Sequence, residues 1–206
     1  MRAEEIMTRT VYSVRPETSL KEVATILVRR GIHGMPVVDG EGVVVGMITE
    51  ADLIDAQVVP DPRLHARRDL RVDDHPPSTA GEVMSTRVVA ARVGADLADL
   101  ARMMLSAHLT RVPVVDEDDR LIGLVSRHDL VRLMTRPDAD IAADVHRVLA
   151  DWYSGPPLAV TVADGEILLA DDGKAVPDLL VALIRAVPGV IGVRWAAPAE
   201  PGKTRS

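Results

Sequence analysis

The stretch MPVVDGEGVVVGMITEADLI at residues 35–54 recurs as VPVVDEDDRLIGLVSRHDLV at residues 112–131. Both copies contain Pro-Val-Val-Asp, then a glycine seven positions later, then an aspartate six positions after the glycine. The copies lie 77 positions apart, and the same register extends upstream to match Met7 with Met84. A repeat in gapless register predicts two copies of one structural unit.

Each copy is expected to fold as strand, helix, strand, strand, helix. The Val-rich runs are short and rich in β-branched residues, which predicts two strands around a polar turn. Upstream, Ser19 with Glu22 and Asp96 with Asp99 predict the starts of two amphipathic helices, and residues 11–14 predict a short leading strand. One such unit leaves a sheet face uncovered, so two units should pack together as an α+β fold with pseudo-twofold symmetry and a cleft.

Two polar pairs stand near the end of the copies: Thr49 with Asp52, and Ser126 with Asp129. A Ser or Thr three residues before an acid, ahead of an apolar run, is a helix N-terminal capping pattern. The plainest interpretation of both pairs is therefore structural.

The repeated pattern, apolar-Pro-Val-Val-Asp then Gly-x-apolar-Thr/Ser-x-x-Asp, resembles a tandem pair of cystathionine β-synthase (CBS) domains over about residues 6–57 and 81–134. In that family the cleft between paired repeats binds adenosyl ligands. The Asp accepts hydrogen bonds from the ribose diol, and the Thr or Ser contacts ribose or phosphate. The resemblance implies these roles for the two polar pairs, with AMP, ATP or S-adenosylmethionine as regulatory ligand. A carboxylate has two acceptor oxygens to match two adjacent hydroxyls.

The candidate nucleotide site also takes in neighbours of these pairs and of the Pro-Val-Val runs. The resemblance implies this set: Thr10, Val11, His33, Met35, Pro36, Thr49, Asp52, Arg87, Val88, Arg111, Val112, Pro113, Ser126, Arg127 and Asp129. The six histidines form no helically spaced pair with a nearby acid that would indicate zinc, and no catalytic constellation is found. Neither a metal site nor enzymatic activity is expected.

The two copies differ in charge around the expected ligand. Four positions become more basic in the second copy: Thr10 becomes Arg87, Gly34 becomes Arg111, Glu50 becomes Arg127 and Ala51 becomes His128. A cation about 6 Å from a phosphate gains roughly 2–3 kcal/mol at an effective dielectric of 20. We therefore expect the Ser126/Asp129 cleft to prefer AMP or ATP, and the Thr49/Asp52 cleft to be empty or to take an uncharged or cationic ligand. Residues of one copy that reach into the other's cleft would blur this contrast.

The composition argues against several classes of protein. The net charge of −7 argues against a nucleic-acid partner, which needs clustered Lys and Arg. Cysteine is absent, which rules out disulfides and a thiol nucleophile and fits a reducing cytoplasm. The N-terminus lacks the apolar core of a signal peptide, and no apolar run approaches transmembrane length.

After the second copy the pattern changes. Asp138 is expected to cap a helix, and a hairpin is expected across Asp164-Gly165, followed by another helix and strand. This αββαβ order over residues 138–196 is similar to a BON domain, a module associated with phospholipid surfaces. Nine acidic against four basic residues give this region a net charge of −5, so binding to anionic lipid is not expected.

The expected domain boundaries follow from these patterns. Proline and mixed charges make the connection between the repeats a loop, and the C-terminal end a disordered tail. The chain is expected to contain repeat one at 1–57, a linker at 58–80, repeat two at 81–135, the BON-like domain at 138–196 and the tail at 197–206. The apolar last helices of the repeats favour a homodimer, which the resemblance also implies.

Two functions fit these patterns. The first is a ligand-sensing regulatory protein whose repeats shift their packing when an adenosyl ligand binds, which requires the ligand to prefer one conformation. The alternative is a structural or stress-associated interaction protein without a bound nucleotide, in which the two polar pairs serve only as helix caps. A regulatory domain cut from a larger enzyme is not expected, because the chain has its own start and tail.

Overall fold

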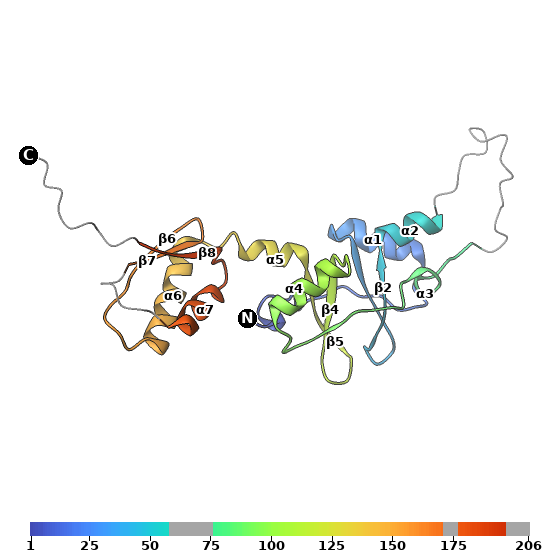
Figure 1. Ribbon diagram of the computed structural model, residues 1–206. Coiled ribbons are helices and arrows are strands. Elements are labelled where there is room, and N and C mark those ends of the chain that lie inside the picture. Colours follow the sequence, from blue (N-terminus) through green and yellow to red (C-terminus); the bar gives the residue numbers. More distant parts are fainter. Residues whose placement is uncertain (58–75, 171–176, 197–206) are drawn as a thin grey trace, which may run out of the picture. The chain divides into compact units, whose positions relative to one another are not determined.

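The computed structural model describes residues 1–57, 76–170 and 177–196 (Figure 1). Apart from Met1, the chain divides into two compact units, residues 2–126 and 127–206. Most of the predicted linker at 58–80 and all of the predicted tail at 197–206 lie outside the described residues. Each unit contains its own hydrophobic core.

The first repeat follows the predicted order. Its elements are α1 (Leu20–Arg30), β1 (Gly34–Val38), β2 (Val44–Thr49) and α2 (Glu50–Gln57). Helix α1 begins where the Ser19 hydroxyl accepts a hydrogen bond from the Glu22 backbone N–H (3.3 Å), and it ends at Gly31, whose φ of 61° suits a residue without Cβ. The predicted leading strand is reduced to one bridge, in which Val14 pairs in parallel with Val37.

The second repeat has the same order of elements. They are β3 (Ala91–Arg92), α4 (Leu97–Ser106), β4 (Arg111–Val115), β5 (Leu121–Ser126) and α5 (Arg127–Leu133). Asp96 caps α4 by accepting hydrogen bonds from the backbone N–H groups of Ala98 (2.8 Å) and Asp99 (3.3 Å). Helix α5 belongs by its contacts to the C-terminal unit, so the boundary between the units falls after residue 126.

The segments that lead into the two repeats are exchanged between them. These segments contain the short helices η1 (Ala3–Glu5) and α3 (Ala80–Val83). After η1, Thr8 pairs with Leu124 of the second repeat, and after α3, Ser85 pairs with Met47 of the first. Because each lead-in extends the sheet of the other repeat, the two repeats are interlocked rather than merely consecutive.

A methionine from each lead-in packs on a glycine of the other repeat. Met7 lies against Gly123, and Met84 lies against Gly46, where each methionine fills the space that a Cβ would occupy. These residues are equivalent under the 77-position offset of the sequence repeat. The packing therefore reproduces the pseudo-twofold symmetry that the repeat predicts.

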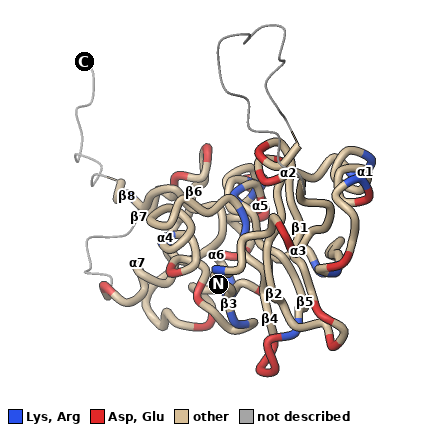
Figure 2. The backbone as a smooth tube through the Cα atoms, turned by 90° about the vertical axis from the view of Figure 1, so that its right-hand side faces the viewer, with Lys and Arg blue, Asp and Glu red and all other residues tan. Residues whose placement is uncertain are grey.

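The turns of the two hairpins meet at one end of the repeats. Val43 bridges Arg120, and the Leu121 N–H donates to the Gly42 carbonyl (3.0 Å). Both turns carry acidic residues (Figure 2), which are Asp39, Glu41, Asp116, Glu117, Asp118 and Asp119. The turn end of the repeats is therefore acidic.

The described part of the C-terminal unit has the predicted αββαβ order. Its elements after α5 are α6 (Asp138–Trp152), β6 (Ala159–Ala163), β7 (Glu166–Ala170), α7 (Asp178–Arg185) and β8 (Gly192–Trp195). Strands β6 and β7 form the predicted antiparallel hairpin across Asp164 and Gly165, both with positive φ, and β7 pairs in parallel with β8. Helices α6 and α7 cover one face of this sheet (Figure 1), where Ile141, Val145 and Ile184 are buried.

The prediction that Asp138 caps α6 is wrong. Pro137 occupies the N-cap position, and Asp138 is the first residue of the helix. Its carboxylate instead accepts hydrogen bonds from the backbone N–H groups of Asp164 (2.8 Å) and Gly165 (2.9 Å) in the hairpin turn. A carboxylate satisfies exposed turn N–H groups as readily as those of a helix, so Asp138 ties the hairpin to the start of α6.

Candidate functional site

The pair Thr49 and Asp52 lies at the start of α2, as the capping pattern predicts. Thr49 donates to Oδ2 of Asp52 from both its backbone N–H (2.7 Å) and its hydroxyl (2.6 Å). Both residues are partly buried. Among the described residues no hydrogen bond reaches Oδ1 of Asp52, so this carboxylate keeps an acceptor for an incoming hydroxyl group.

A histidine and a glutamate border this pair. Nδ1 of His33 lies 2.9 Å from Oε2 of Glu50, and the Glu50 backbone N–H donates to the His33 carbonyl (3.2 Å). Gly34 is paired with Thr49 in the hairpin, which brings their neighbours in sequence side by side. His33 was predicted at the site from the sequence, but its Glu50 partner was not, although the register of the predicted hairpin indicates it.

The side chain of Arg111, from the start of β4, lies against Gly34 of the first repeat. A Cβ at Gly34 would stand 2.6 Å from Nη1 of Arg111 and 3.0 Å from Cγ2 of Thr49. Burial lowers the pKa of Arg111, and the charge of Glu50 acts in the opposite direction. Within the described part of the chain, no hydrogen bond or ion pair is found for this guanidinium.

This position corrects the predicted charge contrast between the copies. Arg111 was expected to make the second copy's cleft more basic, but its guanidinium lies beside Thr49 of the first copy. Gly34 and Arg111 are equivalent under the repeat and touch each other, so both lie near the axis between the repeats. Because Gly34 has no side chain, the long Arg111 side chain reaches across the axis.

Four of the predicted site residues are core residues. Met35 and Val112 are 1% and 0% exposed, and Pro36 and Pro113 are also buried. Their side chains fix β1 and β4 in place. These four side chains therefore belong to the packed interior of the repeats.

The other predicted residues lie in the lead-ins and at the end of the second copy. Thr10 and Arg87 are exposed, whereas Val11 and Val88 are partly buried. Ser126 is the last residue of β5, and the first turn of α5 contains Arg127 and Asp129. The structure thus brings together Thr49, Asp52, His33 and Arg111 within the unit of residues 2–126.

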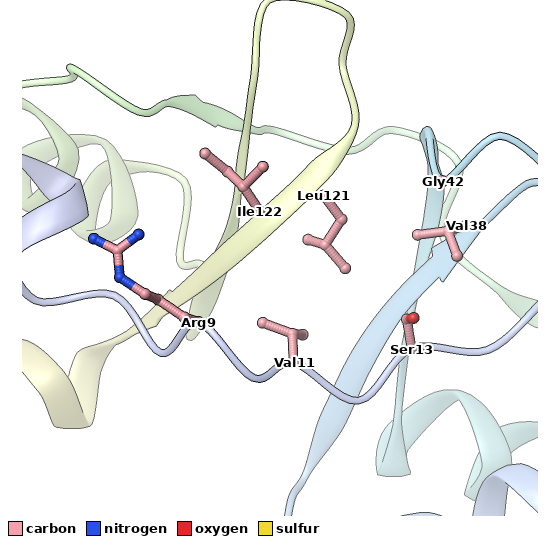
Figure 3. Close-up of a pocket in the computed structure, with 7 residues that line it drawn as sticks. All are labelled: Arg9, Val11, Ser13, Val38, Gly42, Leu121 and Ile122. Carbon is pink, nitrogen blue, oxygen red and sulfur yellow. The ribbon is translucent and has the colours of Figure 1, made fainter.

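A hollow of about 200 Å³ lies at the turn end of the hairpins (Figure 3). It is lined by Arg9, Val11, Ser13, Val38, Gly42, Leu121 and Ile122. Only Val11 belongs to the predicted site, and the Arg9 guanidinium points away from the Ser13 hydroxyl. The charged groups that suit a nucleotide are at the other end of β2, so the hollow is not the candidate site.

The described residues contain no cluster of three His, Asp or Glu side chains that would coordinate a metal ion. In the same ranges, no helix is both long enough and apolar enough to cross a membrane.

Comparison with known proteins matches the CBS domain family at residues 3–59 and 80–136, more than half of the chain. Similar relatives are inosine-5'-monophosphate dehydrogenase of Methanocaldococcus jannaschii (26% identical over 138 residues), the chloroplastic protein CBSX2 of Arabidopsis thaliana (27% over 137) and the magnesium transporter MgtE of Thermus thermophilus (30% over 148). The alignments cover 67%, 59% and 69% of this chain, but 24%, 58% and 28% of the relatives. The chain therefore spans only part of each relative's length.

Three solved structures with bound adenosine-based ligands are also similar. CBSX2 with AMP has a TM-score of 0.54 and 26% identity, covering 69% of this chain and 98% of that one. The CBS pair of protein MJ0100 with 5'-methylthioadenosine and S-adenosylmethionine has a TM-score of 0.52 and 26% identity, covering 65% and 94%. The cytosolic domain of MgtE with ATP has a TM-score of 0.51 and 29% identity, covering 64% and 48%.

Proposed function

The chain belongs to the CBS domain family, and we propose that it is a regulatory protein that senses an adenosine-based ligand between its two repeats. The similar structures of CBSX2, MJ0100 and MgtE hold AMP, S-adenosylmethionine with 5'-methylthioadenosine, and ATP. The proposed site consists of Thr49, Asp52 and Arg111, with His33 and Glu50 at its border. Regulation, rather than catalysis, is proposed as its role.

The observation that carries this proposal is the partly buried guanidinium of Arg111 beside Gly34 and Thr49, without a hydrogen bond among the described residues. A partly desolvated cation is stabilised by an anion that reaches it. A phosphate group would form charge-assisted hydrogen bonds with the planar fork of Arg111. Oδ1 of Asp52 would accept a hydrogen bond from the ribose diol, so that one nucleotide serves both groups.

The acidic residues at this site favour a ligand with few phosphate groups. Glu50 and Asp52 both lie in the first turn of α2, and the charge of Glu50 already acts on Arg111. Like charges at such distances repel by roughly 2 kcal/mol at an effective dielectric of 20. AMP is therefore proposed as a better ligand than ATP for the Thr49/Asp52 site.

The second copy's pair, Ser126 and Asp129, is proposed as a second nucleotide site. Arg127, where the first copy has Glu50, supplies a cation in the first turn of α5. Arg127→Glu is expected to weaken AMP binding at that site and to leave the Thr49/Asp52 site unchanged. A calorimetric titration that shows the same number of AMP sites and the same affinities in both proteins would contradict a role for Arg127.

Thermal unfolding with AMP, ATP, S-adenosylmethionine and adenosine tests the proposed function. A ligand present at 100 times its dissociation constant stabilises the folded protein by about 2.7 kcal/mol. Asp52→Asn is expected to reduce the AMP-induced shift, while Asp55→Asn, exposed on the same helix, should retain it. The absence of a shift with any of the four ligands would contradict the proposal.

A second candidate function is supported by the Thr49 and Asp52 hydrogen bonds themselves. These bonds satisfy a helix N-terminus, and a helix cap needs no ligand. The protein would then be a structural or stress-associated interaction protein. In that case Asp52→Asn would lower the melting temperature, and none of the nucleotides would change it.

We further propose a homodimer that forms through helices of the repeats. The last helices of the two repeats expose large apolar side chains, namely Ile54 on α2 and Val131 on α5. Large exposed apolar side chains are candidates for burial at an interface between two copies. Light scattering that detects only the monomer mass would contradict this assembly.

The C-terminal region is proposed to be a BON-like domain, on the strength of its αββαβ order. Its acidic charge argues against lipid binding, so a fragment beginning at residue 138 should not co-sediment with anionic vesicles at physiological salt. Co-sedimentation would contradict this expectation.

A cytoplasmic location remains a prediction from the absence of cysteine, and the relative CBSX2 is chloroplastic.

A further inference from the structure

We propose that the outer edge of β6 pairs with the same edge of a second copy of this chain, so that the two sheets join into one. Strand β6 stands at the end of the sheet order β6-β7-β8. Among the described residues, no strand pairs with its outer side. An unpaired edge presents backbone N–H and C=O groups that are ready to bind another strand.

Strand β6 lacks the features that usually protect a sheet edge. Its sequence, AVTVA at 159–163, has no charge and no proline, and its register with β7 has no bulge. The opposite edge strand, β8, differs because it carries Arg194, which is paired with Glu166 (2.7 Å). Of the two edges of this sheet, the β6 edge is therefore the more prone to pair with another strand.

The backbone groups of Val160 and Val162 face outward. The Ala196 N–H donates to the Leu169 carbonyl (2.8 Å), so the backbone of Leu169 faces β8 rather than β6. Val160 lies opposite Leu169, and Val162 opposite Ile167, two residues along the strand. The pairs Val160–Leu169 and Val162–Ile167 are therefore non-hydrogen-bonded pairs of the hairpin. The N–H and C=O groups of the two valines point instead to the open edge.

The sequence of β6 reads the same in both directions. An antiparallel copy centred on Thr161 places Val160 of each chain opposite Val162 of the other, where each pair exchanges both hydrogen bonds. Thr161 meets its own counterpart on the twofold axis, and Ala159 meets Ala163. This self-complementary pattern is what an isologous dimer requires.

The charges next to the strand are compatible with this register. The nearest acid in the chain, Asp164, falls opposite Leu158 of the other copy, so no like charges face each other across the edge. A single pair of strands is marginal by itself. The pairing of the two β6 edges is therefore expected to strengthen the homodimer proposed above, in which the helices of the repeats also hold the two copies together. Once these helices hold two chains together, each β6 edge meets the other at a high effective concentration.

Engineered cysteines in the full chain test the register, because the protein has no cysteine of its own. Thr161→Cys places two thiols in a non-hydrogen-bonded pair with Cα atoms about 4.5 Å apart, within disulfide range. Ala163→Cys is the matched control, since it is exposed on the same face but its two copies would lie about 13 Å apart along the strands. Thr161→Cys is expected to form a linked dimer at least about tenfold faster than Ala163→Cys.

Two further variants sharpen the test. A mixture of Ala159→Cys and Ala163→Cys proteins should cross-link faster than either protein alone. Adding Val160→Pro to Thr161→Cys removes an outward N–H without breaking a hydrogen bond to β7. The rate of cross-linking should then fall to that of the Ala163→Cys control. Equal rates for Thr161→Cys and Ala163→Cys would overturn the proposal. A Thr161→Cys chain that stays unlinked would mean that something else covers the edge, and would overturn it as well.

Discussion

Glu50 is the acidic residue whose charge acts on Arg111, and its carboxylate also lies 2.9 Å from His33. In the second copy the same position holds Arg127. In the proposed Thr49/Asp52 site, Glu50 would therefore offset the charge of Arg111 and limit the negative charge that a bound ligand can carry.

Glu50→Gln is expected to raise the affinity for AMP about fivefold or more, because the repulsion between this carboxylate and a phosphate is removed. The affinity for ATP should rise further, since ATP carries more charge. Calorimetric titration measures both, with Glu41→Gln in the first hairpin turn as the control. Unchanged affinities for both nucleotides would show that Glu50 does not face the phosphate.

Asp144 gives the C-terminal unit a defined response to acid. Arg136 donates to Oδ2 of Asp144 (2.8 Å) and to the Pro188 carbonyl (2.8 Å), and this hydrogen bond with Arg136 holds the pKa of Asp144 below its ordinary value. The unfolded chain therefore takes up the proton at a higher pH than the folded one. The stabilisation that the Arg136–Asp144 bond gives the folded C-terminal unit is complete above the ordinary pKa of Asp. It is lost as the pH falls through the lowered pKa of Asp144.

Asp144→Asn is expected to lower the free energy of unfolding of this unit by about 1 kcal/mol at pH 7 and to weaken its loss of stability below about pH 4. Urea denaturation followed by tryptophan fluorescence measures this, because both tryptophans, Trp152 and Trp195, lie in this unit. Asp140→Asn, exposed on the same helix, is the control. Identical pH profiles for the two variants would argue against the role of the Arg136 bond.

Residues whose contacts are local were predictable from the sequence. Thr49 and Asp52 are three positions apart, and any helix that starts between them brings them together. Arg111 and Gly34 are 77 positions apart, and their contact depends on how the repeats pack. The sequence repeat contained one usable signal for this contact, because equivalent residues are the ones that can meet at a twofold axis.

At the scale of elements, the exchanged lead-ins make a specific prediction about β2. Gly46→Ala is expected to lower the free energy of unfolding by about 1–3 kcal/mol, since its Cβ would overlap Met84. The cost should fall in a Met84→Ala background, where the shortened side chain leaves room. Gly94→Ala, where no atom lies within 4 Å of the added Cβ, is the control for urea denaturation. Equal costs for the two glycine variants would mean that the lead-in does not pack on β2.

Elements with their own start and stop signals were predicted well. Helix α1 has Ser19 at its start and Gly31 at its end, and the hairpin of β6 and β7 has Asp164-Gly165 as its turn. The leading strand was not predictable in length, because the chain pairs with the second repeat at Thr8 and reaches the first repeat only at Val14. The role of Asp138 was missed because a carboxylate at a helix start has the same signature whether it binds the helix or a distant turn.

At the scale of the whole molecule, the two units have separate cores and should unfold separately. The core of the first repeat includes Val23, Leu27 and Ile48, whereas that of the C-terminal unit includes Val145 and Ile167. Differential scanning calorimetry is expected to show two transitions. AMP should raise the transition temperature of the unit of residues 2–126, because a ligand stabilises the unit that binds it. Asp144→Asn should lower the transition temperature of the C-terminal unit. A single transition that moves with both changes would contradict this division.

The role of Arg111 as the cation that binds the ligand's phosphate is tested most directly by calorimetric titration of Arg111→Met, which keeps the length of the side chain and removes its charge. AMP is expected to bind this variant at least about tenfold more weakly than the unaltered protein, while adenosine, which has no phosphate, should change less than about twofold. Arg102→Met, at an exposed position paired with Asp99 on α4, should bind both ligands normally. AMP binding to Arg111→Met with unchanged affinity would contradict the proposed site.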